Sequence, residues 1–177
     1  MKKIIIILIV LVVLVASVIT VFSVNYFMLG KPMAETLKSD SRNSGIRIAA
    51  RYGNYLLPSL LVIDVKEVSD ENSAADVFRV LLQYASEIQK MEFEKVNLNS
   101  KGKAKFYLKG DYFRELGEEY DFQNPVYTMR TFPENVYNLD GQKAFPTWTG
   151  GIIGVTGKQI EDFNEFHKQW YINDLFE

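Results

Sequence analysis

The sequence contains no cysteine and only one histidine, His167, among its 177 residues. A chain without cysteine forms no disulfide framework, carries no lipidated cysteine and offers no thiolate to a metal. Zinc sites need several convergent ligands, and neither a second histidine nor a cysteine is present to assist His167. We therefore predict no metal site and no cofactor, and we expect His167 to lie at the surface or boundary of a helix.

Basic charge is also scarce, since 20 lysines and arginines stand against 22 aspartates and glutamates. A nucleic-acid-binding domain needs a basic footprint, so we predict no nucleic-acid partner. The G-x-G-x-x-G, Walker A and G-x-S-x-G patterns of nucleotide-binding and hydrolytic proteins are missing as well. The sequence therefore predicts no catalytic residue, and an enzyme remains an alternative only if folding brings Glu118 or Glu119 to His167.

One long apolar run, Ile4 to Val24, carries no charge. About 20 helical residues cover the ~30 Å hydrocarbon core of a bilayer. Lys2 and Lys3 precede the run, which favours a cytoplasmic N-terminus. We predict that residues 1–29 form an uncleaved, single-pass anchor in the inner (cytoplasmic) membrane, with the C-terminal part outside the cytoplasm. A cleaved secretory signal is the alternative, although its apolar region is usually shorter, about 7–15 residues.

The chain beyond the anchor has a polar segment and then the length of one domain. Residues 30–45 combine Pro32 and Gly45 with small polar side chains and few apolar ones. We expect this segment to be a flexible tether. Residues 46–177 are expected to form one soluble, extracytoplasmic (periplasmic) domain with a single core.

Hydrophobic periodicity divides this domain into strands and helices. The patterns predict strands at 46–52, 60–68, 93–98 and 103–109, helices at 74–88, at 112–116 and up to about Tyr171, and an extended region at 124–133. Capping-box patterns at Ser73/Asp76 and Thr156/Gln159 predict two helix starts, and Asp111 and Gly117 are expected to cap the short helix at its two ends. Hairpins beside helices predict an α+β fold with an antiparallel or mixed sheet and helices packed on one face.

Two groups of residues are candidates for binding another protein. Glu118, Glu119 and Asp121 form an acidic cluster, and Tyr137, Phe145 and Trp148 are aromatic residues in expected loops. Aromatic side chains are frequent at interface hot spots, so we predict that these residues contact an envelope protein.

The second strand pair carries lysines, which we expect mainly to block unwanted strand pairing: Lys90, Lys95, Lys101, Lys103, Lys105 and Lys109. Anionic headgroups, or the acidic cluster in the same or a second copy, are alternative contacts for these lysines. A homo-oligomer therefore stays open.

The stretch Trp148–Gly157, WTGGIIGVTG, has four glycines in ten residues. Glycine lets the backbone approach a ligand or a neighbouring element closely. We expect close packing of the last helix on the sheet to be the cause. In the alternative, Gly150, Gly151 and Gly154 line a small-ligand or lipid-binding loop together with the nearby aromatic residues.

Part of the chain, from Tyr107 to Tyr171, resembles single-anchor proteins of bacterial envelopes that have no assigned activity. The strings that carry the resemblance are GDYFRELGEEYDFQNPVYTMRTFPENVY, DGQKAF, WTGGIIGV and EDFNEFHKQWY. The resemblance implies a bacterial source and an envelope location, and it implies no catalytic residue. The hypothesis is thus a membrane-tethered, non-enzymatic interaction or accessory domain.

Overall fold

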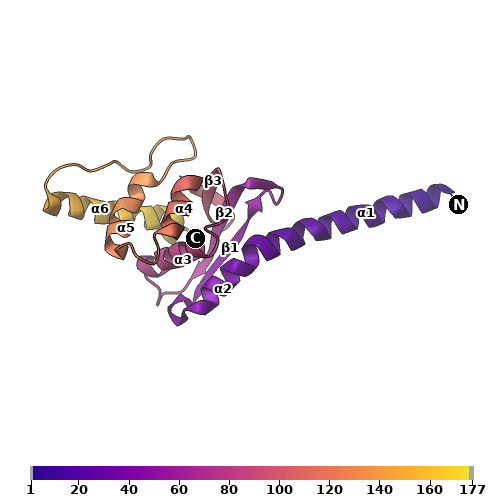
Figure 1. Ribbon diagram of the computed structural model, residues 1–177, viewed down its shortest axis with the longest axis horizontal. Helices are drawn as coiled ribbons and strands as arrows, with labels where there is room; N and C mark the ends of the chain where they lie inside the picture. The colour runs from indigo at the N-terminus through magenta and orange to yellow at the C-terminus, as the bar shows by residue number, and fades with distance from the viewer. Residues whose placement is uncertain (1, 176–177) are drawn as a thin grey trace.

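The computed structural model describes residues 2–175, except for the side chains of residues 152 and 153. A long helix projects from a domain in which helices pack against one sheet (Figure 1). The predicted α+β fold is confirmed, and the sheet is of the mixed kind.

The sheet has four strands in chain order: β1 (Ile46–Gly53), β2 (Leu57–Val68), β3 (Lys95–Ser100) and β4 (Lys103–Lys109). The pairs β1–β2 and β3–β4 are antiparallel hairpins, and β2–β3 is parallel. A parallel pair needs a crossover connection, which α3 (Ala74–Glu87) provides between β2 and β3. The predicted capping box of Ser73 and Asp76 starts this helix.

Alternation along the strands places one set of side chains in the core. Neighbouring buried residues in register include Ile48 beside Val65, and Ile63 beside both Ala50 and Leu98. Buried side chains of α3, α4 (Gly110–Glu118) and α6 (Ile152–His167) join this face in a single core. Burial of this apolar surface is the main source of stability for the domain.

The long apolar helix runs directly into the domain. Helix α1 (Lys2–Asn25) continues through a π-helical turn, η1 (Tyr26–Gly30), into α2 (Lys31–Ser39), and a short 3₁₀ turn, η2 (Ser41–Asn43), follows. This differs from the flexible coil expected at 30–45. Leu29 and Met33 lie one helical turn apart and are fully buried, so they hold the segment against the sheet and α3. Pro32 follows directly after the π-helical turn, within this continuous helical segment.

Helix α4 starts and ends differently from the prediction. It begins at Gly110 rather than Tyr112, and Lys109, not Asp111, is its N-cap residue. Gly117 is not a left-handed helix stop, because its φ is not positive. It lies inside the helix, where a Cβ atom would collide with the backbone carbonyl of Ala85 in α3. Gly117 thus allows two helices to approach closely.

Helix α5 (Pro125–Thr131) replaces the extended region predicted at 124–133, so that prediction was wrong. The Asn124 side chain accepts a hydrogen bond from the Val126 amide, and Pro125 occupies the first turn, where its missing N–H has no cost. Asn-Pro therefore starts a helix here. The 3₁₀ turn η3 (Phe132–Asn135) follows.

The C-terminal helix α6 begins at Ile152 with Gly151 as its N-cap, so the predicted start at Thr156 was wrong. It continues through a π-helical turn, η4 (Lys168–Ile172), into α7 (Asn173–Leu175). Phe163, Phe166 and Trp170 bury one face of this long element, as the periodicity predicted.

Candidate interaction site

A cavity of about 340 Å³ opens between α3, α4 and α5. Its floor is apolar and includes Phe78 and Leu82 of α3, Leu116 of α4 and Met129 of α5. The close approach of α4 to α3 at Gly117 and the turn into α5 at Asn124 and Pro125 create this hollow. Its size and lining suit an apolar group of modest size.

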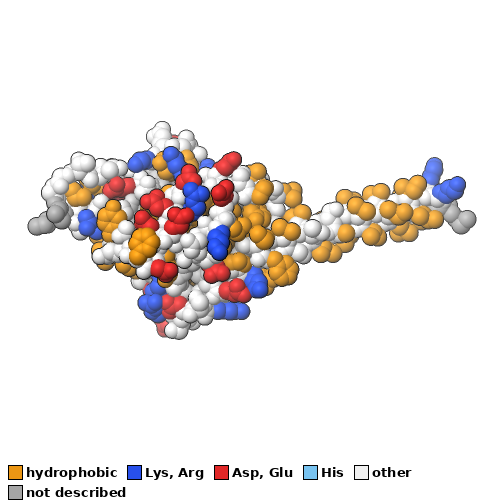
Figure 2. Space-filling model, in the orientation of Figure 1, with side chains coloured by type: hydrophobic (Ala, Val, Ile, Leu, Met, Phe, Trp, Pro, Cys, Tyr) orange, Lys and Arg blue, Asp and Glu red, His pale blue; other side chains and the backbone are white. Residues whose placement is uncertain are grey.

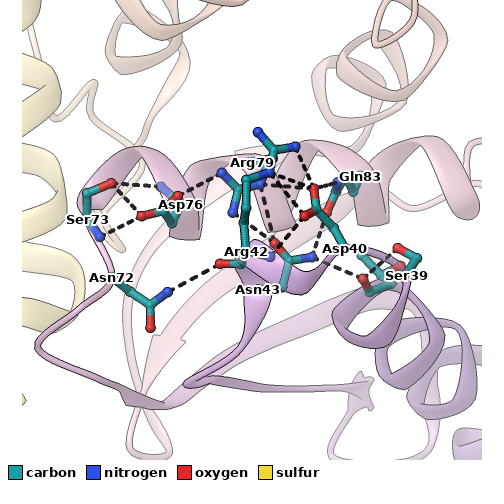
Figure 3. A network of polar contacts seen from close by, with 10 residues as sticks. Ser39, Asp40, Arg42, Asn43, Asn72, Ser73, Asp76, Arg79 and Gln83 are labelled. Atoms are coloured by element: carbon teal, nitrogen blue, oxygen red, sulfur yellow. Dashed lines mark hydrogen bonds and ion pairs between the residues drawn. The ribbon is translucent and has the colours of Figure 1, made fainter.

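A network of polar contacts forms one rim of the cavity (Figure 3). Arg42 binds both carboxylate oxygens of Asp40, with a closest distance of 2.6 Å between its Nη2 and Oδ2. The hydrogen bonds from Arg42 hold the pKa of the Asp40 carboxyl well below its usual range. The two side chains therefore form an ion pair in which each charge compensates the other. Arg42 also lines the cavity.

Arg79 and Asn43 connect this rim to helix α3. Arg79 donates to Asp76 at 2.7 Å and to the Asn43 side chain at 3.1 Å. Asn43 in turn donates to the Gln83 side chain at 2.8 Å and to the Thr36 carbonyl at 3.1 Å. Hydrogen bonds from Ser73 lower the pKa of Asp76, so its charge is retained. The network fixes the end of α2 against α3 (Figure 3).

The acidic residues predicted as a candidate site lie around the end of α4. Glu119 lines the cavity, whereas Glu118 and Asp121 are exposed. Arg114 is 3.7 Å from the Glu118 carboxylate, an exposed pair of small energetic value. Figure 2 shows acidic side chains gathered over the face that carries α4. Within residues 2–175, no group of three or more acidic or histidine side chains is arranged to hold a metal ion.

Exposed apolar side chains lie on the same stretch of chain, next in sequence to residues that line the cavity. Phe122 is 76% exposed, and Val126 and Tyr127 of α5 are 58% and 52% exposed. They lie in the α4–α5 connection and on α5, which supplies Pro125, Thr128 and Met129 to the cavity wall. We call the set of Phe122, Val126 and Tyr127 the α5 patch.

The three predicted loop aromatics lie in different environments. Phe145 is buried at 7% exposure against Phe106 and Phe166, so little of it is open to a partner. Tyr137 forms a short antiparallel bridge to β4 and stacks on Tyr107, with ring centroids 5.2 Å apart. The structure does not bring these residues together with the acidic cluster at one site.

Trp148 is half-buried near the start of α6. Its indole N–H donates to the Asp162 carboxylate at 2.7 Å, and the Lys158 ammonium lies 5.9 Å from its ring centre. These contacts give the indole a structural role in holding the loop to the helix.

The glycine-rich stretch is open rather than closely packed. A Cβ atom at Gly151, Gly154 or Gly157 would meet nothing within 4 Å. The expectation that these glycines allow α6 to approach the sheet was therefore wrong. Gly150 has a φ of +135°, so it turns the chain into the helix in a conformation that favours glycine.

The lysines of the second hairpin find partners other than the acidic cluster. The Lys105 ammonium is 2.8 Å from the Asp174 carboxylate, and Lys101 donates to the Asp174 carbonyl. Lys95 lies over the Tyr107 ring, 3.7 Å from its centre. The C-terminal α7 therefore neutralises part of this basic surface.

His167 is fully buried, which corrects the expected surface position. It lies among Phe78, Phe163, Phe166 and Tyr171 and does not approach the acidic cluster. The enzymatic alternative that paired it with Glu118 or Glu119 has no geometric support.

Comparison with known proteins gave no match: no family model, no curated protein and no solved structure resembles this chain at a significant level. The candidate site therefore stands on its geometry. The α5 patch was missed in the sequence because Val126 and Tyr127 were assigned to an extended segment. The signal that could have revealed it is Asn124-Pro125, which is typical of an N-cap and first helical residue.

Proposed function

We propose that this protein is a membrane-tethered, extracytoplasmic domain of the bacterial envelope that binds another protein and catalyses no reaction. The observation that carries the proposal is the exposed α5 patch, on the same chain segment whose Gln123, Pro125 and Thr128 line the 340 Å³ cavity. Exposed apolar side chains gathered beside a hollow are typical of interaction surfaces.

The location rests on α1. One helix at the N-terminus is long and apolar enough to cross a membrane, and its side chains are exposed from Ile4 to Thr20. Its basic end, visible at the tip in Figure 2, favours the cytoplasmic side. The domain then lies outside the cytoplasm, as a single-pass protein of the inner membrane.

The chemistry of the surface indicates the kind of partner. An apolar side chain of the partner would fill the cavity against Phe78, Leu82 and Met129. Around it, the exposed Glu118 and Asp121 favour basic residues on the partner. Such an apolar anchor with a charged rim matches the usual anatomy of interfaces.

Site-specific photo-crosslinking tests this surface in the cells that make the protein. A photoreactive phenylalanine analogue at Phe122 is expected to give one discrete adduct after irradiation, because that position is exposed and directly precedes Gln123 of the cavity wall. The matched control places the analogue at Leu139, which is 51% exposed on another loop. Equal adducts at both positions, or none at Phe122, would contradict the proposal. An adduct of twice the chain's mass would identify a second copy as the partner.

A small apolar ligand is the second candidate, because the cavity volume lies within the ~300–1,000 Å³ range of ligand pockets. This moves the predicted ligand site from Gly150, Gly151 and Gly154 to the cavity. Fatty acids and envelope lipids are expected to raise the melting temperature of the purified protein. An Ala75→Phe variant, which narrows the mouth, should lose the effect.

A further inference from the structure

A second group of exposed apolar residues lies at the turn between β1 and β2. Leu56 is 73% exposed, and Tyr55 and Leu57 are also open. We call Tyr55, Leu56 and Leu57 the apolar turn. It is separate from the α5 patch and lies next to α1, where Figure 2 shows apolar side chains continuing from the helix onto the domain. Nothing in the predicted interaction surface explains it.

Contacts to α1 set the depth of this turn. The rings of Tyr55 and Phe22 are 5.0 Å apart. If Ile4 to Val24 spans the hydrocarbon core, Phe22 lies only about 3 Å inside its outer boundary, at 1.5 Å of rise per residue. The turn therefore lies at the same depth as the boundary between acyl chains and headgroups.

Asn25 holds the turn in this place. Its side-chain amide donates to the Tyr55 carbonyl at 2.8 Å and its carbonyl oxygen accepts from the Tyr52 amide at 2.8 Å. Asn25 is buried at this junction, so its polar atoms do not face lipid. Because the helix continues into the core through Leu29 and Met33, the turn cannot move independently of α1.

The backbone conformation of the turn does not favour a tyrosine at position 55. Asn54 and Tyr55 have φ values of 47° and 64°, and the Leu56 amide donates to the Gly53 carbonyl. Residues 54–56 thus connect the paired Gly53 and Leu57, and the left-handed backbone at position 55 favours glycine. A tyrosine there costs free energy, which points to a role for its side chain. Arg51 lies 4.9 Å over its ring, as a cation beside an interfacial aromatic residue.

We propose that the apolar turn inserts into the interfacial layer of the bilayer that holds α1, so that the domain contacts the membrane at two points. The inference rests on the proposed membrane anchoring. Tyrosine favours the headgroup layer, and leucine next to it buries apolar surface among the upper acyl chains. Two points of contact, joined by Asn25, fix the tilt of the domain on the membrane.

The absence of cysteine makes a clean test possible with single-cysteine variants of the full chain. An NBD fluorophore is attached at Leu56→Cys, at Phe122→Cys and at Val10→Cys, in nanodiscs of phosphatidylethanolamine and phosphatidylglycerol. Lipids with a spin label at the top of the acyl chain quench fluorophores at that depth. We expect blue-shifted emission and loss of most of the fluorescence at position 56. At the equally exposed position 122 we expect neither.

The three positions separate the two proposals. Quenching at position 10 but not at position 56 would overturn the inference and leave the anchor intact. No quenching at position 10 by lipids labelled deep in the chain would overturn both. Quenching at 122 as strong as at 56 would mean that the whole domain lies on the membrane, which also overturns the two-point contact.

A second variant tests the role of the tyrosine. Tyr55→Gly places glycine at a position with a left-handed backbone, so the fold is expected to be retained or strengthened. The proposal predicts that NBD at position 56 is nevertheless less quenched in this variant, because the ring no longer anchors the turn. Unchanged quenching would show that Tyr55 has no part in membrane contact.

Discussion

His167 is a titratable residue within the aromatic core, where it is fully buried. Its Nδ1–H donates to the Phe163 carbonyl at 2.9 Å, because a carbonyl oxygen only accepts, and its Nε2 has no hydrogen-bond partner. Burial lowers the pKa of His167 from 6.5 to about 4. The imidazole is therefore neutral in the folded protein at neutral pH.

This residue predicts a pH dependence of stability. The unfolded chain binds a proton near pH 6.5, whereas the folded chain binds it only near pH 4, so acid favours unfolding. From about pH 7 to about pH 5, the free energy of unfolding should fall by ~2 kcal/mol through this group. Urea unfolding followed by tryptophan fluorescence measures the change. In a His167→Phe variant the decrease in the free energy of unfolding between these pH values should be smaller by that amount. An unchanged decrease would contradict the lowered pKa of His167.

At the scale of elements, two glycines in helices give opposite predictions. Gly117→Ala places a Cβ atom against the Ala85 carbonyl, so α4 and α3 must separate. Overpacking of this kind costs about 1–3 kcal/mol, and we expect a loss of at least that size in the free energy of unfolding. Gly157→Ala in α6 meets nothing within 4 Å and should instead stabilise by about 0.5–1 kcal/mol. Equal effects of the two changes would refute the packing at Gly117.

The elements also show where sequence patterns succeed. Strands β1 to β4 and helix α3 were predicted because alternation, helical spacing and the Ser73 cap all agree. Helix α5 and the helical segment 31–39 were not predicted, because their proline and polar residues suggested that no helix forms there. Their helicity depends on tertiary contacts, such as the burial of Leu29 and Met33, which no local pattern reveals.

The sites could be predicted only in part for the same reason. The acidic residues at 118–121 were noted, but their position beside a cavity depends on how α4 approaches α3. Phe145 was expected at the surface because it lies in a loop, yet that loop packs it on Phe106. The apolar turn became visible only when the contact between Tyr55 and Phe22 placed it against α1.

At the scale of the whole molecule, the proposed orientation predicts which side of the membrane the domain occupies. Phe122→Cys should react with a membrane-impermeant maleimide in intact spheroplasts, because the position is exposed on the outer domain. The cysteine-free parent gives the background. Labelling that requires permeabilisation would show that the domain is cytoplasmic. In that case the charge of Lys2 and Lys3 does not decide the orientation.

Because helix runs unbroken from Lys2 to Ser39, the α5 patch has a fixed position and orientation relative to α1. A domain on a flexible linker loses rotational entropy each time it binds a partner, and that loss opposes association. In this protein the continuous helix already restricts rotation of the domain before a partner binds. With α1 in the membrane, as proposed, a partner in the same membrane would meet the α5 patch at a constant distance from the bilayer. A smaller contact area then suffices for a complex of a given lifetime.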